Sequence, residues 1–219
     1  MVDAAAANGV FLMEALWSRF QPGYVLLRDL LDEGAIGTPN HVEAEFAFRV
    51  PDAEGPGHRL FDGARLGGAL VDLGIYPIHL CHYVFGEPTT VEAAAVVRGG
   101  VDLQTSLALA WPDATATLFC SIDVAGRNQA RIVGKDGVIT LDAFMHVPPR
   151  LTVQRTGEEP EHHDTAVTLP GLQYQAEEVH RCIRAGLRES PTMPWSETLA
   201  MMRTLDRVRD RIGLRFLSE

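Results

Sequence analysis

The fold is decided by residues 89–142, which read TTVEAAAVVRGGVDLQTSLALAWPDATATLFCSIDVAGRNQARIVGKDGVITLD. Apolar runs in this stretch are separated by Gly-Gly, Pro-Asp and Gly-Lys-Asp-Gly, which are turn-forming sequences. Strands joined by such short turns pair antiparallel, because a parallel pair needs a long crossover connection. The pattern therefore predicts an antiparallel sheet with strands at residues 89–98, 101–111, 114–124, 127–133 and 137–142, and with a further strand at residues 150–155 after Pro148 and Pro149.

The segments on either side of this stretch add one more strand and four helices. Residues 38–49 alternate between polar and apolar side chains, as a half-buried strand does, and residues 51–66 are rich in Pro, Gly and Asp, as a loop is. Helices are expected at residues 22–33, 68–85, 173–186 and 196–213. The fold class is thus expected to be α+β, an open and predominantly antiparallel sheet with helices on one face.

The first 22 residues have a different pattern. The run Ala4–Ala7 followed by Asn8 and Gly9 predicts the end of a helix, because Asn and Gly tolerate the left-handed conformation of a C-cap. Residues 10–15 form a short apolar run of the kind found in buried parallel strands. The chain is therefore expected to open with the last helix and strand of an α/β unit.

Composition restricts the class of partner. The chain has 219 residues, 46% of them hydrophobic, and a formal net charge of −10, so it can bury a core and its surface repels polyanions. Nucleic acid and anionic membranes are therefore poor partners, and a small molecule is expected. Three widely spaced cysteines and the absence of a positively charged leader favour a reducing, cytoplasmic location.

Polar side chains interrupt the apolar stretch GGALVDLGIYPIHL, residues 67–80. On a helix, Asp72, Tyr76, His79 and Tyr83 lie on one face, because they are spaced at i, i+4, i+7 and i+11. This stripe can be a chemical site. It can equally be structural, since a carboxylate is favoured in the first turn of a helix and buried Tyr and His side chains are usually hydrogen-bonded.

Other candidates have ordinary alternatives as well. Trp17 and Arg19 follow the expected parallel strand, where open α/β sheets bind ligands, but they can also be a core tryptophan and a surface arginine. A zinc site at His79 and His82 lacks a third ligand at a suitable spacing, so no metal is expected. No GxGxxG or GxxxxGK[ST] motif occurs in the sequence, so the chain carries no phosphate-binding loop of its own.

Four segments together resemble one family. They read EALWSRFQP, GGALVDLGIYPIHL, GKDGVITLDAFMHVPP and CIRAGLRESPTMPWSETLAMMRTLDRVRDRIGL. In this order they resemble the Gfo/Idh/MocA oxidoreductases, in particular the dihydrodiol and D-xylose dehydrogenase branch. The resemblance implies that residues 1–22 are the remnant of an NAD(P)-binding Rossmann domain and residues 23–219 are the C-terminal substrate-binding and oligomerisation domain.

The resemblance also implies site residues. Asp72 and Tyr76 match the DxGxY pattern of the dihydrodiol branch, in which the tyrosine is the proposed acid/base. Trp17 and Arg19 match the WxRF segment that borders nicotinamide and substrate. His79, which stands where much of the family has an aspartate, is also expected to bind substrate. The family's catalytic lysine, in a Glu-Lys-Pro motif, has no counterpart, because the only lysine is Lys135 in a Gly-Lys-Asp-Gly turn.

Two functions of different class follow from these observations. The first is the substrate-binding domain of an NAD(P)-dependent oxidoreductase, which acts on CH–OH groups of a sugar or diol and forms homo-oligomers through its open sheet. Such a chain is expected to be inactive without its cofactor-binding half. The second is a non-catalytic binding or dimerisation module derived from such an enzyme. A metal hydrolase at His79 and His82 would require stoichiometric metal.

Overall fold

One open sheet organises the computed structural model, which describes residues 1–51, 58–167 and 171–216. Within those residues, eight strands lie in the order β2-β3-β4-β1-β5-β6-β7-β8. Their bounds are β1 (Pro39–Ala47), β2 (Thr90–Arg98), β3 (Val101–Ala110), β4 (Thr115–Ser121), β5 (Ala130–Gly134), β6 (Gly137–Leu141), β7 (Arg150–Arg155) and β8 (Glu161–Asp164). Among these described strands, only β1 and β4 pair in parallel, so the prediction of an open, predominantly antiparallel sheet is confirmed.

The topology explains the one parallel pair. Strands β2, β3 and β4 follow each other by short turns and pair antiparallel, as such turns require. Strands β5 to β8 also follow each other in the sheet and pair antiparallel, with the longer segment 142–149 between β6 and β7. Strand β1 lies between the two groups, parallel to β4 and antiparallel to β5. The chain that leaves β1 passes through α3, β2 and β3 before it reaches β4, which is the long connection that a parallel neighbour needs.

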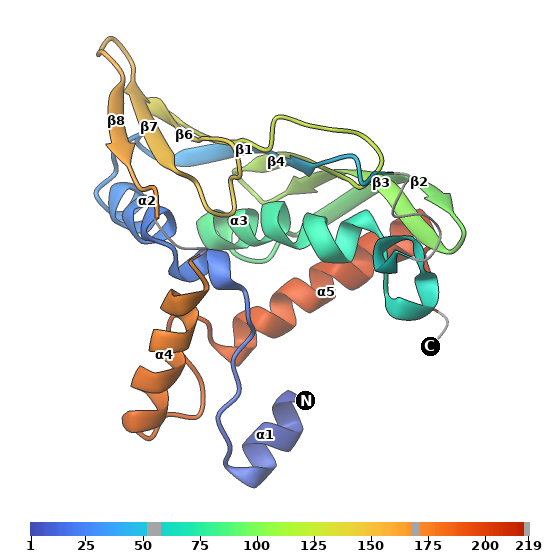
Figure 1. Ribbon diagram of the computed structural model, residues 1–219. Coiled ribbons are helices and arrows are strands. Elements are labelled where there is room, and N and C mark those ends of the chain that lie inside the picture. Colours follow the sequence, from blue (N-terminus) through green and yellow to red (C-terminus); the bar gives the residue numbers. More distant parts are fainter. Residues whose placement is uncertain (52–57, 168–170, 217–219) are drawn as a thin grey trace.

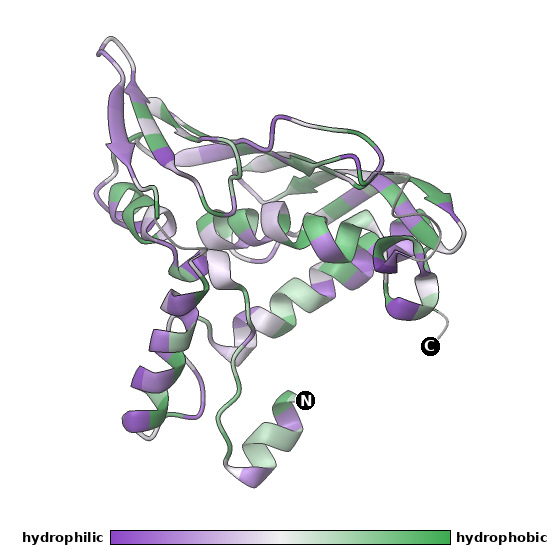
Figure 2. Ribbon diagram, viewed as in Figure 1, coloured by the Kyte–Doolittle hydropathy of each residue, from purple (hydrophilic) through white to green (hydrophobic). Residues whose placement is uncertain are grey.

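Helices cover one face of the sheet. Figure 1 shows α2 (Pro22–Asp32), α3 (Ile75–Phe85) and α5 (Trp195–Ile212) on the same side of it, while α1 (Val2–Asn8) and α4 (Leu172–Arg184) extend away from the sheet. In β1 the side chains of Val42, Ala44 and Phe46 are buried, and the alternate positions are more exposed. Figure 2 shows that α3, which lies under the sheet, is mostly hydrophobic, whereas the edge strand β8 is hydrophilic.

The helix predicted at residues 68–85 has two parts. A π-helical turn, η5 (Leu70–Gly74), precedes α3, so each residue after it is rotated relative to a continuous α-helix. Pro77 gives a local reason, since it cannot donate a backbone hydrogen bond to the preceding turn and its ring crowds the carbonyl four residues back. The expected helix exists, but Asp72 lies in a different register from Tyr76.

One sequence prediction was wrong. Residues 10–15 form no strand, and among the described residues the backbone N–H of Leu12 bonds to the carbonyl of Arg188 instead of to a sheet. A parallel strand requires neighbours on which to form its ladder, and none of the eight strands pairs with this segment. The helix before it is as predicted, and α1 ends at Gly9 in the left-handed conformation.

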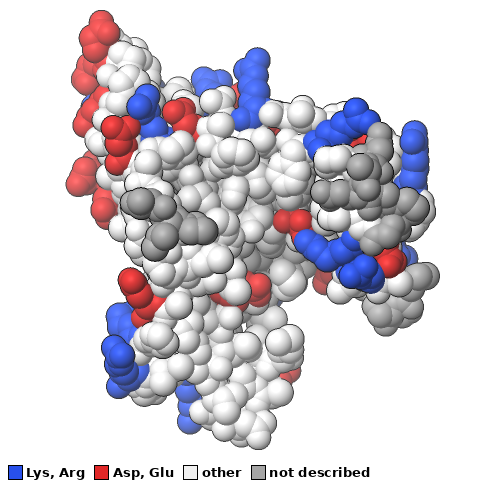
Figure 3. All heavy atoms as spheres, viewed as in Figure 1, with Lys and Arg blue, Asp and Glu red and all other residues white. Residues whose placement is uncertain are grey.

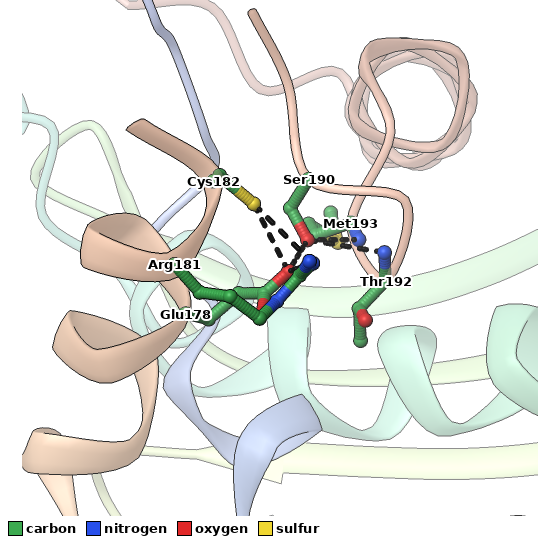
Figure 4. A network of polar contacts seen from close by, with 6 residues as sticks. All are labelled: Glu178, Arg181, Cys182, Ser190, Thr192 and Met193. Atoms are coloured by element: carbon green, nitrogen blue, oxygen red, sulfur yellow. Dashed lines mark hydrogen bonds and ion pairs between the residues drawn. The ribbon is translucent and has the colours of Figure 1, made fainter. Parts of the chain in front are cut away.

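A carboxylate holds α4 to the segment that follows it. Glu178 accepts hydrogen bonds from Arg181, from the Ser190 hydroxyl at 2.5 Å and from the Cys182 thiol at 3.2 Å. Figure 4 shows these side chains converging on Glu178 from α4 and from the loop that leads to α5. The Arg181 guanidinium and these donors lower the pKa of Glu178 to about 2, so its charge contributes to this junction.

Candidate functional site

Two residues that are 59 positions apart meet at the sheet-facing helices. Trp17 opens the short helix η1 (Trp17–Phe20), and Tyr76 is the second residue of α3. The indole Nε1–H of Trp17 donates a hydrogen bond of 2.9 Å to the Tyr76 hydroxyl oxygen. Both side chains are half-buried, so the pair keeps access to solvent. The structure therefore brings together two of the residues that the sequence singled out.

Two further rings complete an aromatic cup around this pair. Phe46, near the end of β1, packs edge-on against Tyr76 with 5.3 Å between ring centroids. His146, in the segment between β6 and β7, lies 5.0 Å from Tyr76, 5.4 Å from Trp17 and 4.4 Å from Phe46. We call Trp17, Phe46, Tyr76 and His146 the aromatic cup. Its walls come from four separate elements and are largely apolar, with hydroxyl and imidazole groups as the polar points.

The environment of Tyr76 favours the protonated phenol. Burial raises the pKa of Tyr76, and the nearby charge of Asp72 raises it further, while the hydrogen bond from Trp17 lowers it. Because Trp17 occupies a lone pair of the phenol oxygen and not its hydrogen, the phenol O–H remains available to a further acceptor. Tyr76 is thus arranged as a proton donor.

Asp72 lies beside the cup and not within its hydrogen bonds. It belongs to the π-helical turn, and its Oδ1 accepts a hydrogen bond of 2.5 Å from the Arg59 guanidinium. Its side chain is 25% exposed, and that of Arg59 is 51% exposed. The two residues form a solvent-accessible ion pair near Tyr76, and Asp72 affects the phenol through its charge.

Arg19 faces a different neighbourhood. Its guanidinium forms an ion pair with Glu197 of α5 and lies over the Tyr83 ring, 5.0 Å from the centroid. The two side chains of the pair are 11% and 20% exposed. Trp17 and Arg19 therefore share one short helix but point to different partners, the tryptophan to Tyr76 and the arginine to α5.

His79 lies behind the cup in the protein core. It has no exposed surface, its ring stacks on Tyr24 with 5.4 Å between centroids, and neither ring nitrogen has a hydrogen-bond partner among the described residues. Burial, aided by the charge of Arg19, holds the pKa of His79 well below its usual range. The ring is thus neutral, and the structure does not bring it into the aromatic cup.

His82 likewise belongs to the core. Its Nε2 lies 2.9 Å from the Thr204 hydroxyl, and burial lowers the pKa of His82 to about 4. In residues 1–51, 58–167 and 171–216, no three His, Cys, Asp or Glu side chains lie close enough together to hold a metal ion.

Sequence reasoning missed Phe46 and His146. His146 stands within GKDGVITLDAFMHVPP, but a single histidine in a segment between strands carries no spacing signal of its own. Burial against the other rings lowers the pKa of His146 to about 4, so the imidazole is neutral near pH 7. Its Nδ1 is buried without a hydrogen-bond partner among the described residues. A polar ligand atom in the cup could satisfy it.

The uncovered face of the sheet carries a second feature. A hollow of about 510 Å³ lies there, lined by charged side chains of both signs, among them Glu43, Glu45, Arg127 and Arg131, and by Leu107, Leu118 and Phe119. Arg131 forms an ion pair with Glu43 at 2.9 Å. On the face shown in Figure 3, acidic residues gather at the β7–β8 end, and the central part is largely uncharged.

The residues present do not form a complete dinucleotide site. The sequence has no glycine-rich phosphate loop, and the part of the sheet that the structure describes contains a single parallel pair instead of the successive parallel strands on which such loops stand. Trp17 and His146 offer half-buried aromatic rings beside Tyr76. In the part of the chain that the structure describes, no helix is long and apolar enough to cross a membrane.

Comparison with known proteins adds the family relationship. A family model described as the GFO/IDH/MocA C-terminal domain matches residues 24–140. Relatives named trans-1,2-dihydrobenzene-1,2-diol dehydrogenase from Homo sapiens and Oryctolagus cuniculus are each 34% identical to the chain. These alignments cover 99% of the chain, but only 66% of the human protein and 68% of the rabbit protein. The chain thus spans about two thirds of the length of these relatives.

Solved structures share the fold. Aldose-aldose oxidoreductase from Caulobacter crescentus, complexed with glycerol, matches with a TM-score of 0.82 at 24% identity, over 97% of this chain and 64% of that one. Levoglucosan dehydrogenase in complex with NADH and levoglucosan matches with a TM-score of 0.81 at 17% identity, over 96% of this chain and 66% of that one. At these identities the likeness establishes the fold alone.

Proposed function

The chain belongs to the GFO/IDH/MocA family, and on that premise we propose that it is the substrate-binding part of an NAD(P)-dependent oxidoreductase. The proposed reaction is hydride transfer at a CH–OH group of a sugar or diol. Relatives named as diol dehydrogenases support the diol, and structures named with glycerol or levoglucosan support a polyhydroxylated substrate.

One observation carries the proposal, namely the hydrogen bond from Trp17 to Tyr76 inside the aromatic cup. Oxidation of a secondary alcohol removes a hydride from carbon and a proton from oxygen, and the reverse reaction returns both. The proton needs a positioned donor and acceptor, and Tyr76 is a protonated phenol held in a fixed direction by Trp17. The rings of the cup exclude bulk water from one side of that phenol.

The proton steps follow from this arrangement. In the direction of reduction, Tyr76 donates its proton to the carbonyl oxygen as that oxygen gains charge. In the direction of oxidation, the Tyr76 phenolate accepts the hydroxyl proton, and the raised pKa of Tyr76 opposes formation of that phenolate. A nearby cation would lower this pKa, but Lys135 is exposed in the turn between β5 and β6. The lysine that the family resemblance implies would be this cation, and we propose that it belongs to the cofactor-binding part of the enzyme.

Other candidate residues take supporting roles in this proposal. Asp72 acts through its charge on Tyr76 or binds a substrate hydroxyl at the edge of the cup, since its side chain is accessible. Trp17 contacts both the substrate and the nicotinamide ring of the cofactor. Arg19 and His79 support the cup without lining it. Arg19 fixes η1 to α5, and His79 packs as a neutral ring against Tyr83.

The cofactor is proposed to be held elsewhere. A nicotinamide dinucleotide, when bound, would supply or accept the hydride. Residues 1–22 are then the end of the dinucleotide-binding domain and residues 23–219 the substrate-binding domain, which is consistent with the chain spanning 66% of the human relative. The three cysteines are free and buried, which supports a reducing compartment such as the cytoplasm.

We propose that the uncovered sheet face is where two copies of the chain associate. The hollow on this face places the half-buried Phe119 beside Glu43 and Arg131, and a two-fold axis pairs a patch with its own copy, so opposite charges can meet. Light scattering tests this proposal. A dimer that dissociates when Phe119 is replaced by Glu supports it, and a stable monomer of the unaltered chain contradicts it.

The catalytic proposal is tested in a chimera. The part of the rabbit relative that precedes its match to this chain is joined ahead of residue 1, so that Trp17 is retained, and NADP⁺ reduction is followed with vicinal diols and aldoses. Tyr76→Phe is expected to lower kcat by about 10²- to 10⁴-fold, the usual contribution of a positioned acid/base, with little change in KM. The matched control is Tyr83→Phe on the same helix, because the Tyr83 hydroxyl donates to the Tyr24 carbonyl instead of facing the cup.

The outcomes separate the two classes of function. An active chimera that tolerates Tyr76→Phe as well as Tyr83→Phe contradicts the role of Tyr76. A folded chimera that binds NADP⁺ but oxidises none of the substrates favours a non-catalytic module.

A further inference from the structure

A carboxylate from the sheet reaches the start of the helix that carries Tyr76. Asp102, the second residue of β3, has no exposed surface. Its Oδ2 accepts a hydrogen bond of 2.8 Å from the backbone N–H of Leu70 and one of 2.7 Å from the Thr105 hydroxyl. Leu70 opens the π-helical turn η5, and the preceding residue Ala69 offers no side-chain cap.

The Asp102 carboxylate supplies the hydrogen-bond acceptor that the start of the helix lacks. The first N–H groups of a helix have no partner within it, and a negative charge is favoured there by the helix dipole. In many proteins a Ser, Thr, Asp or Asn at the N-cap accepts from these groups. Here the acceptor comes from a strand 32 residues further along the chain. The helix start is therefore held by tertiary structure and not by its own sequence.

The paired glycines before the helix make this approach possible. Gly68 has φ of +116°, and a Cβ on it would lie 2.3 Å from Oδ1 of Asp102. A Cβ on Gly67 would lie 2.5 Å from the carbonyl oxygen of Arg59. Any side chain at residue 68 would therefore displace the carboxylate. The position of Asp102 thus accounts for Gly68, and the close backbone of residues 59 and 60 accounts for Gly67.

The start of the helix controls the direction of Tyr76. Residues 70–74 form the π turn, and Tyr76 follows it directly within α3. Replacing that turn by an α-helical one changes the register by one residue, which rotates later side chains by about 100°. Such a rotation would take the phenol away from Trp17. On the other side, a Cβ on Gly74 would lie 3.0 Å from Cys120 Sγ, so the turn is packed closely against β4.

We infer that Asp102 is a positioning residue for Tyr76, because as a hydrogen-bond acceptor it caps η5 and so holds the phenol against Trp17. The inference rests on the proposed role of Tyr76, but its test needs no turnover. Burial raises the pKa of Asp102, and the hydrogen bonds from Thr105 and Leu70 lower it. The acceptor oxygen and not the charge is the feature that the cap requires, so asparagine can replace aspartate here.

The test uses the indole N–H signals of the full 219-residue chain, labelled with ¹⁵N-tryptophan. The chain has three tryptophans, and the other two donate to backbone carbonyls of Gly86 and Leu12, so they serve as internal controls. Tyr76→Phe provides the position of the Trp17 signal when its acceptor is lost. The variants are Asp102→Ala, Asp102→Asn and, as a matched control, Thr105→Val, which removes the other hydrogen bond to Oδ2.

We expect Asp102→Ala to move the Trp17 signal at least half of the way to its position in Tyr76→Phe, while the other two indoles stay in place. Asp102→Asn and Thr105→Val are expected to leave the Trp17 signal unchanged. A folded Asp102→Ala variant that melts earlier but keeps the Trp17 signal overturns the inference, because that residue is then merely structural.

The asparagine variant keeps the inference falsifiable if the alanine variant does not fold. A displaced Trp17 signal in folded Asp102→Asn also overturns it, since the acceptor oxygen is still present. An inactive chimera with an intact Trp17 signal would count against the proposed function and not against this inference.

Discussion

The ion pair between Arg19 and Glu197 allows a quantitative test of what Arg19 does. The two side chains are 11% and 20% exposed, and Arg19 Nε has no hydrogen-bond partner among the described residues. Removing one partner of a buried pair costs about 3–5 kcal/mol, whereas an exposed pair is worth about 0–1 kcal/mol. With this residual exposure, we expect Glu197→Gln to lower the free energy of unfolding by about 2–3 kcal/mol.

The assay is urea-induced unfolding followed by circular dichroism, with a thermal melt beside it. For a chain of this size, about 2–3 kcal/mol corresponds to a fall in Tm of roughly 4–12 °C. The matched control is Glu87→Gln, which breaks the pair between Glu87 and Arg203, whose side chains are 35% and 56% exposed. That variant is expected to lose less than about 1 kcal/mol.

A double variant separates charge from packing. Arg19→Met with Glu197→Leu removes both charges and keeps side-chain volume, so it is expected to recover most of the stability lost in Glu197→Gln. The reasoning is refuted if Glu197→Gln loses no more stability than Glu87→Gln. In that case the ion pair does not fix η1 to α5, and Arg19 is available to contact a ligand.

Three further predictions concern protonation and cofactor binding. Glu178→Gln is expected to lower the free energy of unfolding by about 1–2 kcal/mol at pH 7. The difference in free energy of unfolding between this variant and the unaltered chain should become smaller as pH falls from about 4.5 toward 2. In that range the Glu178 carboxyl is protonated in the unfolded chain before it is protonated in the native one, where its pKa is about 2. The role of the Glu178 charge is contradicted if urea unfolding shows the same difference in free energy between the two proteins at every pH from about 4.5 to 2. The His146 ring should titrate in NMR with a midpoint near 4, so that this residue lowers stability as pH falls from about 6.5 to 4, when the unfolded state takes up the proton. A midpoint near 6.5 would show an open, hydrated ring. Fluorescence titration of the isolated chain with NADPH should show no saturation at micromolar concentration, since the chain has no phosphate loop. Micromolar binding would contradict the proposal that the cofactor is held elsewhere.

Much of the sheet could be predicted from the sequence because the signals are local. Turns such as Gly99-Gly100 and Gly134–Gly137 lie between strands that pair with each other directly, so neighbours in sequence are neighbours in the sheet. The alternation in β1 reports burial of one face and needs no knowledge of the partner strands. The parallel placement of β1 beside β4 was not visible, because that contact joins segments about 75 residues apart without a turn between them.

The candidate site was predictable only in part. Trp17 and Tyr76 were selected by resemblance, and the structure places them in contact. His146 and Phe46 were missed because their side chains reach Tyr76 from separate elements, and no spacing rule links those positions. The expected stripe of Asp72, Tyr76, His79 and Tyr83 was broken by the π turn, which ideal helical spacing does not anticipate.

The sequence by itself determined most of the strands, the helices and the polar residues available to a site, since periodicity, turn chemistry and composition act over short stretches of chain. Tertiary structure alone decided which of those residues meet. Asp102 reaches Leu70 from β3 and sets the register of the helix, so Tyr76 faces Trp17 while His79 is buried against Tyr24. The physical reason is that a cap, a π turn and a ring contact each depend on atoms from distant segments, and packing of the whole chain brings those atoms within hydrogen-bond distance.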